Sequence, residues 1–248
     1  MNTFDFYEFE HPTISFFGRS FAEYTRFFDL NPAALRGRKV LDVAAGPASF
    51  TAEAVRHGID ALAVDPLYGC TSGALEAHVQ LDYRRIVAQL RAKPQLFQTA
   101  AGEAVGRSVF ASLDEAEQDR RTAAAGFLAD YENGFLYGRY VGGVLPRLPC
   151  PDRAFDMVLC AHLLFIHARH FDLVWHVDAC RELARVASGE VRIHPVCGPD
   201  GQSYPGLDSL RGQLQEHGIM SEVVSVNYEF FVGSSSMLVL RPAAEQRL

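Results

Sequence analysis

Two acidic residues lie near the ends of two apolar runs early in the chain. Asp42 is part of KVLDVAA, residues 39–45, and Asp65 is part of DALAVDP, residues 60–66. Both runs have the β-branched, apolar character of buried strands. Ligands of open α/β sheets bind in the crevice beyond the carboxyl ends of the strands. An acidic side chain that ends the second strand is therefore placed to accept hydrogen bonds from two ribose hydroxyls.

The turn after the first run contains a single glycine, Gly46, which is followed by Pro47. Glycine lets a ligand approach the backbone where a Cβ atom would collide. A dinucleotide site requires G-x-G-x-x-G, so that a helix N-terminus holds the pyrophosphate, whereas Pro47 removes a donor N–H from that place. The turn favours a nucleoside ligand without phosphate, and S-adenosylmethionine is a common cofactor of this kind. A tight turn that binds nothing is the alternative interpretation of Gly46.

The surrounding elements predict an α/β fold. A helix at residues 47–57 joins the two runs into a β-α-β unit, which implies a parallel sheet with right-handed crossovers. Further strands are expected at residues 155–161 and 190–196, each followed by a helix. The runs 222–232 and 236–242, joined by a turn near Gly233, predict an antiparallel hairpin at the end of the sheet.

We expect a single domain over residues 1–248, with residues 1–35 as an N-terminal helical leader. Within it, residues 15–30 form a predicted aromatic helix that carries Phe17, Phe21, Tyr24 and Phe28 on one side. Core packing is one interpretation of these rings, and closure over a ligand is the other.

A long segment, residues 67–138, separates the second strand from the next elements and is expected to form a helical insertion. Its helical patterns lie near residues 73–93 and 113–136, and an insertion of this length is commonly functional. It is either additional core or a lid that packs over the crevice and selects the acceptor.

These motifs resemble those of class I S-adenosylmethionine-dependent methyltransferases over residues 36–241. LDVAAGPA is similar to the family's D/E-x-G-x-G-x-G motif, although Ala44 and Ala48 stand where glycines are usual. AVDP is similar to the second motif, which implies that Asp65 binds the ribose and that Pro66 and Leu67 lie beside the adenine. Residues 138–165 resemble a third segment, with Val144 in place of an acidic adenine contact.

The resemblance implies a Rossmann-like seven-stranded sheet in the order 3-2-1-4-5-7-6, with an antiparallel last strand and helices on both faces. It implies S-adenosyl-L-methionine as cofactor and O- or N-methylation of a small molecule, such as an aromatic or specialised metabolite. The alternatives are non-methylating use of the same cofactor, a catalytically silent partner subunit, or another Rossmann-like enzyme that uses a nucleotide. The predicted cofactor-binding residues are Asp42, Ala44, Gly46, Pro47, Asp65, Pro66, Leu67, Val144, Leu145, Cys160 and Tyr24.

Histidines are the candidate bases, because their charge changes near neutral pH. A base is needed only if the acceptor arrives protonated, as a phenol, ammonium or acid does. His162 follows the fourth strand and His194 ends the fifth, so both are predicted at the carboxyl rim of the sheet. Capping or packing is the alternative role for each.

Charge and composition exclude several classes of partner. The net charge is −7, and no run of Lys and Arg provides the footprint of a nucleic-acid-binding protein. No apolar stretch approaches the length of a membrane span, and the acidic N-terminus lacks the basic region of a signal peptide. Five cysteines without a CxxC pair predict free thiols and no metal site. We therefore expect a cytoplasmic monomer or homodimer that acts on a small molecule.

Overall fold

The computed structural model describes residues 14–99 and 109–242, which form one seven-stranded sheet in the order β3-β2-β1-β4-β5-β7-β6. Strands β1 to β5 pair in parallel, and β7 pairs antiparallel with both β5 and β6. The predicted fold class and strand order are confirmed. The strands are β1 Lys39–Val43, β2 Asp60–Asp65, β3 Tyr140–Gly142, β4 Phe155–Ala161, β5 Ala187–His194, β6 Ile219–Ser225 and β7 Ser236–Pro242.

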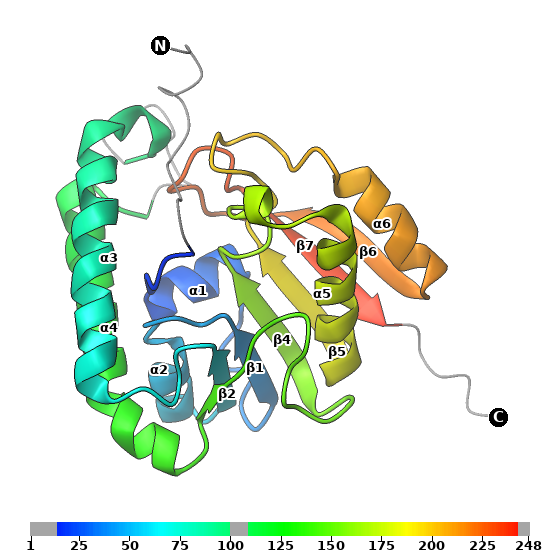
Figure 1. The fold of residues 1–248 in the computed structure, drawn as a ribbon, viewed down its shortest axis with the longest axis horizontal. Helices are drawn as coiled ribbons and strands as arrows, with labels where there is room; N and C mark the ends of the chain where they lie inside the picture. Colours follow the sequence, from blue (N-terminus) through cyan, green and yellow to red (C-terminus); the bar gives the residue numbers. More distant parts are fainter. Residues whose placement is uncertain (1–13, 100–108, 243–248) are drawn as a thin grey trace.

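Helices cover both faces of the sheet (Figure 1). The long helices α3 and α4 stand side by side at one side of the molecule, and α5 lies in front of the central strands. Side-chain caps begin several helices, as where Thr71 Oγ1 accepts from Ala74 N at the start of α3. The helices are α1 Phe21–Phe27, α2 Phe50–Arg56, α3 Ser72–Ala92, α4 Leu113–Leu136, α5 Leu173–Val186 and α6 Leu207–Glu216.

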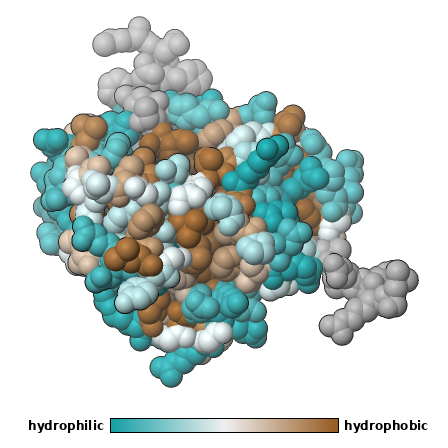
Figure 2. Space-filling view, turned by 60° about the horizontal axis from the view of Figure 1, so that its bottom comes forward, coloured by the Kyte–Doolittle hydropathy of each residue, from teal (hydrophilic) through white to brown (hydrophobic). Residues whose placement is uncertain are grey.

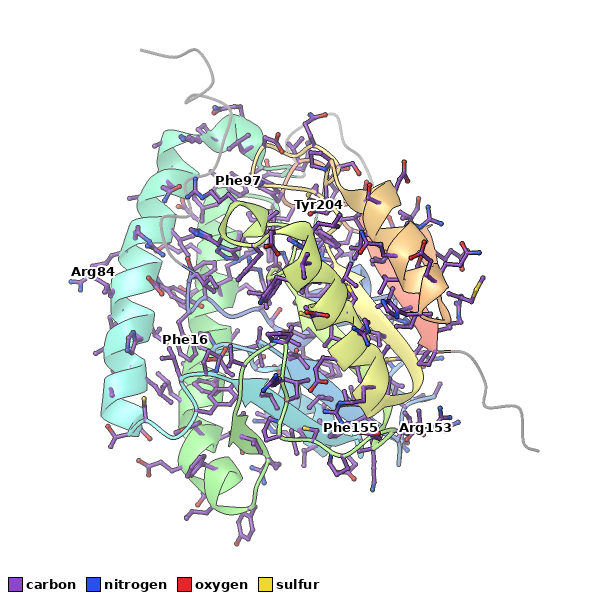
Figure 3. The ribbon with its side chains drawn as sticks, turned by 45° about the vertical axis from the view of Figure 1, so that its right-hand side comes forward. Phe16, Arg84, Phe97, Arg153, Phe155 and Tyr204 are labelled. Carbon is purple, nitrogen blue, oxygen red and sulfur yellow. The ribbon has the colours of Figure 1, made fainter. Side chains whose placement is uncertain are left out.

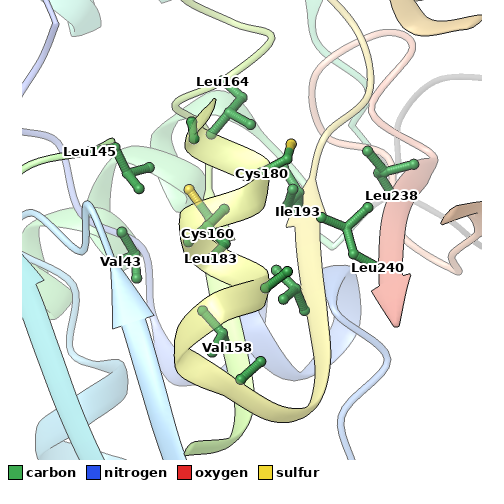
Figure 4. Close-up of a cluster of buried hydrophobic side chains, with 14 of the residues drawn as sticks. Val43, Leu145, Val158, Cys160, Leu164, Cys180, Leu183, Ile193, Leu238 and Leu240 are labelled. Atoms are coloured by element: carbon green, nitrogen blue, oxygen red, sulfur yellow. The ribbon is translucent and has the colours of Figure 1, made fainter. Parts of the chain in front are cut away.

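The strand β1 shows how the sheet separates two cores. Its last four residues are buried, as expected for a central parallel strand covered on both faces. Alternate side chains point to opposite faces, so Leu41 and Val43 join the cluster beneath α5 and α6, whereas Val40 joins the cluster beneath α1 and α2. Figure 4 shows the first of these clusters, with Cys180 and Leu183 of α5 packed against the strands.

The predicted hairpin is present, but the second half of its first strand is wrong. Residues 219–225 pair with 236–242 as β6 and β7, but residues 226–232 leave the sheet. Their backbone pairs instead with the segment after α3, where Gln98 N donates to Phe230 O and Val232 N donates to Leu96 O. The aromatic run thus satisfies its backbone hydrogen bonds outside the sheet and buries its rings elsewhere.

The helix boundaries near the N-terminus also differ from the prediction. In the described part of the leader only Phe21–Phe27 is helical, and Phe17 lies in the extended segment before it. The helix α2 begins three residues later than predicted, and in the turn that precedes it Ala44 and Gly46 both adopt positive φ, near +56°. None of the helices in the described ranges is long and apolar enough to cross a membrane.

Candidate functional site

A cavity of about 510 Å³ lies beyond the carboxyl ends of β1, β2 and β4. The strand order reverses between β1 and β4, and ligands of this fold class bind in the crevice at such a topological switch point. Its walls come from the leader, the turns after the strands, the insertion and the loop after β6. Phe16 and Phe97, labelled in Figure 3, both lie between α3 and α5 and line this cavity. Figure 2 shows apolar side chains gathered at the centre of one face of the molecule, with polar ones around them.

Asp65, the last residue of β2, presents its carboxylate to the cavity. The side chain is held by two backbone donors, since Gly46 N donates to Oδ2 at 3.0 Å and Leu67 N donates to Oδ1 at 3.0 Å. Each oxygen keeps a further lone pair, because a carboxylate has about four acceptor positions. Asp65 is only 7% exposed, and burial raises its pKa to about 6. Near neutral pH it is therefore an oriented anion with unused acceptor capacity.

The turn between β1 and α2 is closed to a phosphate group. Gly46 N is bonded to the Asp65 carboxylate, and Ser49 N donates to the carbonyl of Arg19 in the leader. The leader also lies directly on this turn, because a Cβ added at Gly18 would meet Pro47 O at 2.1 Å. The N-terminal amides that hold phosphates at such turns are thus engaged or covered.

The structure brings seven of the eleven predicted cofactor-binding residues to the cavity wall. The side chain of Val144 is 60% exposed, so the position of the missing acidic contact is open and apolar. The seven wall residues are Ala44, Gly46, Asp65, Pro66, Leu67, Val144 and Leu145.

Asp42, Tyr24, Pro47 and Cys160 are buried away from this wall. Tyr24 donates its hydroxyl to Asp42 Oδ1 at 3.3 Å, while Asp42 Oδ2 has no hydrogen-bond partner among the described residues. Burial raises the pKa of Asp42 well above its ordinary value. Tyr24 packs in the cluster beneath α1 and α2, and Cys160 packs in the cluster beneath α5 and α6.

Of the two predicted histidines, only His162 lines the cavity. It has φ +53°, a conformation that is rare for a residue with a Cβ and is commonly found at functional sites. Its Nδ1 has no hydrogen-bond partner in the described ranges, and burial, with the charge of Arg19 nearby, lowers its pKa well below the ordinary value. The ring is therefore a neutral imidazole at physiological pH.

His194 lies next to His162 but faces the protein interior. Its Nε2 donates to Ser234 O at 2.7 Å, and its ring stacks on Phe27 with centroids 4.6 Å apart. Burial lowers its pKa to about 3. The strand end was predicted correctly, but the side chain turns toward α1 because Phe27 and Tyr228 surround it with aromatic rings.

Sequence reasoning missed a buried polar cluster at the leader end of the cavity, where α1 and α4 meet. Arg120 of α4 bonds Glu23 of α1 through Nη2 and Oε1 at 2.8 Å, with side chains only 2% and 1% exposed. Tyr228 O–H donates to the same Oε1 at 2.6 Å. The Arg120 guanidinium also lies 4.4 Å from the ring centroid of Phe230. Arg120, Tyr228 and Phe230 all line the cavity, and the only sequence signal was an Arg on an otherwise apolar stripe.

The insertion contributes one long wall through α3, while Arg120 comes from α4. The leader is sealed against α3, because Phe16 N donates to Asp82 Oδ2 at 2.7 Å and Arg85 donates to Ser15 Oγ at 2.7 Å. The cavity-lining residues of α3 are His78, Leu81, Asp82, Ile86 and Leu90.

No family model matches the sequence. Over 224 residues the chain is 28% identical to an uncharacterized protein of Methanocaldococcus jannaschii, MJ0045, and the alignment covers 90% of this chain and 94% of that protein. Among solved structures, it is similar to a TehB-like SAM-dependent methyltransferase of Corynebacterium glutamicum, with 16% identity, a TM-score of 0.43, and coverage of 86% and 87% of the two chains. It is also similar to magnesium protoporphyrin IX methyltransferase of Synechocystis with bound SAM, with 13% identity, a TM-score of 0.40, and coverage of 84% and 72%. Likenesses this distant leave the activity to be argued from the cavity.

Proposed function

We propose that this protein binds S-adenosyl-L-methionine and transfers its methyl group to a small-molecule acceptor by O- or N-methylation. The observation that carries the proposal is the Asp65 carboxylate, oriented by two backbone N–H groups at the carboxyl end of β2 and open to an apolar cavity. Vicinal ribose hydroxyls match this arrangement, since both would donate to one anion.

The cavity fits a nucleoside cofactor better than a dinucleotide. A pyrophosphate requires free backbone donors at the turn after β1, and Gly46 N and Ser49 N are already bonded. The ionised Asp65 beside the turn would also repel a phosphate. On the adenine side, Pro66, Leu67 and Leu145 provide apolar contacts for a base.

The cofactor supplies an activated methyl group, and the protein's task is to orient the acceptor and exclude water. We place His162 at the acceptor. Its lowered pKa makes it a weak base in the empty cavity, so its first role is to accept a hydrogen bond from an acceptor hydroxyl or amine. Proton transfer to the imidazole becomes favourable as methylation makes that group more acidic.

The acceptor site is proposed at the end of the cavity formed by α3, α4 and the loop after β6. Its wall is mainly aliphatic and aromatic, which suits an apolar or aromatic body. Residues of this wall are Ile86, Leu90, Phe97, Tyr228, Phe230 and Phe231.

Calorimetric titration with S-adenosylhomocysteine tests the cofactor assignment. Asp65→Ala should weaken binding by about 1.5–3 kcal/mol, the range for hydrogen bonds to a charged group. Asp60→Ala, at the exposed opposite end of β2, is the matched control and should bind as the wild type does. Absence of binding to the wild-type protein would refute the proposal, and preferential binding of NAD or ATP would favour a nucleotide-dependent enzyme.

Methyl transfer itself is tested with S-adenosylmethionine labelled on the methyl group and a panel of phenols, amines and carboxylic acids. Transfer to any member of the panel supports the proposed reaction. Tight cofactor binding without transfer to any acceptor class would favour non-methylating chemistry or a silent partner subunit.

A further inference from the structure

The leader end of the cavity contains more positive than negative charge. Arg19 of the leader and Arg120 of α4 both line it, and their charges interact. Glu23 is the carboxylate that interacts with Arg19. Two guanidinium groups therefore share one carboxylate.

The hydrogen bonds of that carboxylate go to Arg120 and Tyr228, and its Oε2 has no hydrogen-bond partner among the described residues. Glu23 Oε1 accepts from Arg120 Nη2 and from Tyr228 O–H, and Arg120 Nη1 donates to Ala116 O at 3.1 Å. The Arg120 guanidinium also lies 5.1 Å from the ring centroid of Phe110 and 4.4 Å from that of Phe230. Its charge is thus neutralised within the protein.

Arg19 has no carboxylate partner of this kind among the described residues, and its guanidinium lies 5.0 Å from the ring centroid of Phe17. Its Nη1 makes both of the side chain's hydrogen bonds, to Phe17 O at 3.0 Å and Gly18 O at 3.2 Å. Its Nε is buried without a partner, and no carboxylate in the described ranges forms a salt bridge with it. Burial and the charge of Arg120 lower its pKa. Burying a cation without a counter-ion is costly, so a ligand anion beside Arg19 would be stabilised there.

The other ionisable groups on the wall do not complete it. Asp82 pairs with Arg85 at 3.1 Å and accepts from Phe16 N, and Asp65 is held by two backbone amides. The pKa of His162 is lowered well below its ordinary value. Among the described residues on the wall, none supplies the negative charge that would match Arg19, and a ligand anion could supply it.

We propose that Arg19 is a carboxylate-binding residue of this cavity, which offers Nε and Nη2 side by side to one ligand carboxylate. This fork of parallel N–H groups matches the two oxygens of a carboxylate. The inference rests on the proposed function, under which the carboxylate has two sources. One is the amino-acid end of the cofactor, and the other is a carboxylate on the acceptor.

Matched pairs of probes separate these sources by calorimetry. S-adenosylhomocysteine and 5′-methylthioadenosine share the nucleoside, but only the first carries a carboxylate. 2-Naphthoate and 2-naphthamide share an aromatic body and differ in the same way. The variants are Arg19→Gln and Arg19→Lys, with Arg91→Gln, a 62% exposed arginine side chain on α3, as the control for loss of one positive charge. Circular dichroism checks that each variant is folded.

Arg19→Gln should weaken one carboxylate probe at least tenfold and leave its neutral counterpart within twofold, while Arg19→Lys restores part of the loss. If only the binding of S-adenosylhomocysteine is weakened, Arg19 binds the carboxylate of the cofactor. If the binding of 2-naphthoate is weakened, Arg19 binds a carboxylate of the acceptor. The proposal would be overturned if Arg19→Gln affected charged and neutral probes equally, or affected neither. It would also be overturned if the wild-type protein bound no carboxylate probe. Failure of S-adenosylhomocysteine to bind would refute the proposed cofactor, and the naphthoate pair, which is titrated separately, would then decide the role of Arg19.

Discussion

Cofactor affinity and protein stability should both change with pH as Asp65 titrates, and they should change in opposite directions. Burial raises the pKa of this carboxyl to about 6 in the unliganded protein. Ribose hydroxyls donate to the ionised form, so binding requires the carboxylate that burial disfavours. Affinity for S-adenosylhomocysteine should therefore fall as the pH is lowered through 6.

The expected size follows from the fraction of Asp65 that is ionised. If only the carboxylate binds, the dissociation constant is nearly constant above pH 7, about doubles at pH 6 and rises about tenfold at pH 5. The stability of the unliganded protein should move the other way. A folded-state pKa above the unfolded value favours folding at low pH, and this contribution is lost between about pH 4 and pH 6. The shift from 3.8 to about 6 corresponds to about 3 kcal/mol.

Calorimetry with S-adenosylhomocysteine between pH 5 and 8 measures the first effect, and urea unfolding between pH 4 and 8 measures the second. Asp65→Asn is the control, because it has a similar shape and no titratable group. Its affinity should be low and nearly independent of pH, and its stability should lack the fall assigned to Asp65. Wild-type affinity that is constant from pH 5 to 8, or a variant with the same pH profile as the wild type, would contradict the reasoning.

Three further changes test other parts of the cavity. His162→Ala should lower turnover far more than S-adenosylhomocysteine affinity, and an equal loss of both would make His162 a binding residue only. Arg120→Met should destabilise the protein by about 3–5 kcal/mol in urea unfolding, because it leaves Glu23 buried without its cation. The double variant Arg120→Met with Glu23→Leu should recover much of the lost stability. If the losses of the two single variants simply added, Glu23 and Arg120 would not be coupled. Ile86→Ala with Leu90→Ala should change which acceptors are methylated while S-adenosylhomocysteine affinity stays within about tenfold, or about 1.4 kcal/mol. A larger loss of affinity would show that this wall supports the cofactor.

The sheet was predictable because its central strands are continuous apolar runs, and burial on both faces leaves such runs few alternatives. The carboxylate of Asp65 was predictable for the same reason, since the end of a strand fixes which edge of the sheet it reaches. The direction of a buried side chain was not. His194 is at the predicted strand end, yet its ring stacks on Phe27, a contact set by the packing of α1.

Contacts between distant segments explain the remaining differences. The residues after β6 carry alternating aromatic side chains, which predict a strand. Their backbone finds partners at Leu96 and Gln98 instead, more than a hundred residues earlier in the chain. The pairing of Glu23 with Arg120 likewise joins segments 97 residues apart. Local pattern contains no information on such pairings.

The hydrogen bond between Glu23 and Tyr228 spans 205 residues, and this separation bears on how the protein folds. Chains fold in the order of their synthesis where they can, N-terminal parts first. Here an early segment holds a buried carboxylate whose phenolic partner is synthesised 205 residues later. Contacts of such large sequence separation form late, because the chain entropy lost in closing the intervening loop is large. The parallel strands can therefore assemble while the leader is still undocked, and the capacity to bind a ligand is among the last properties that the folding chain acquires.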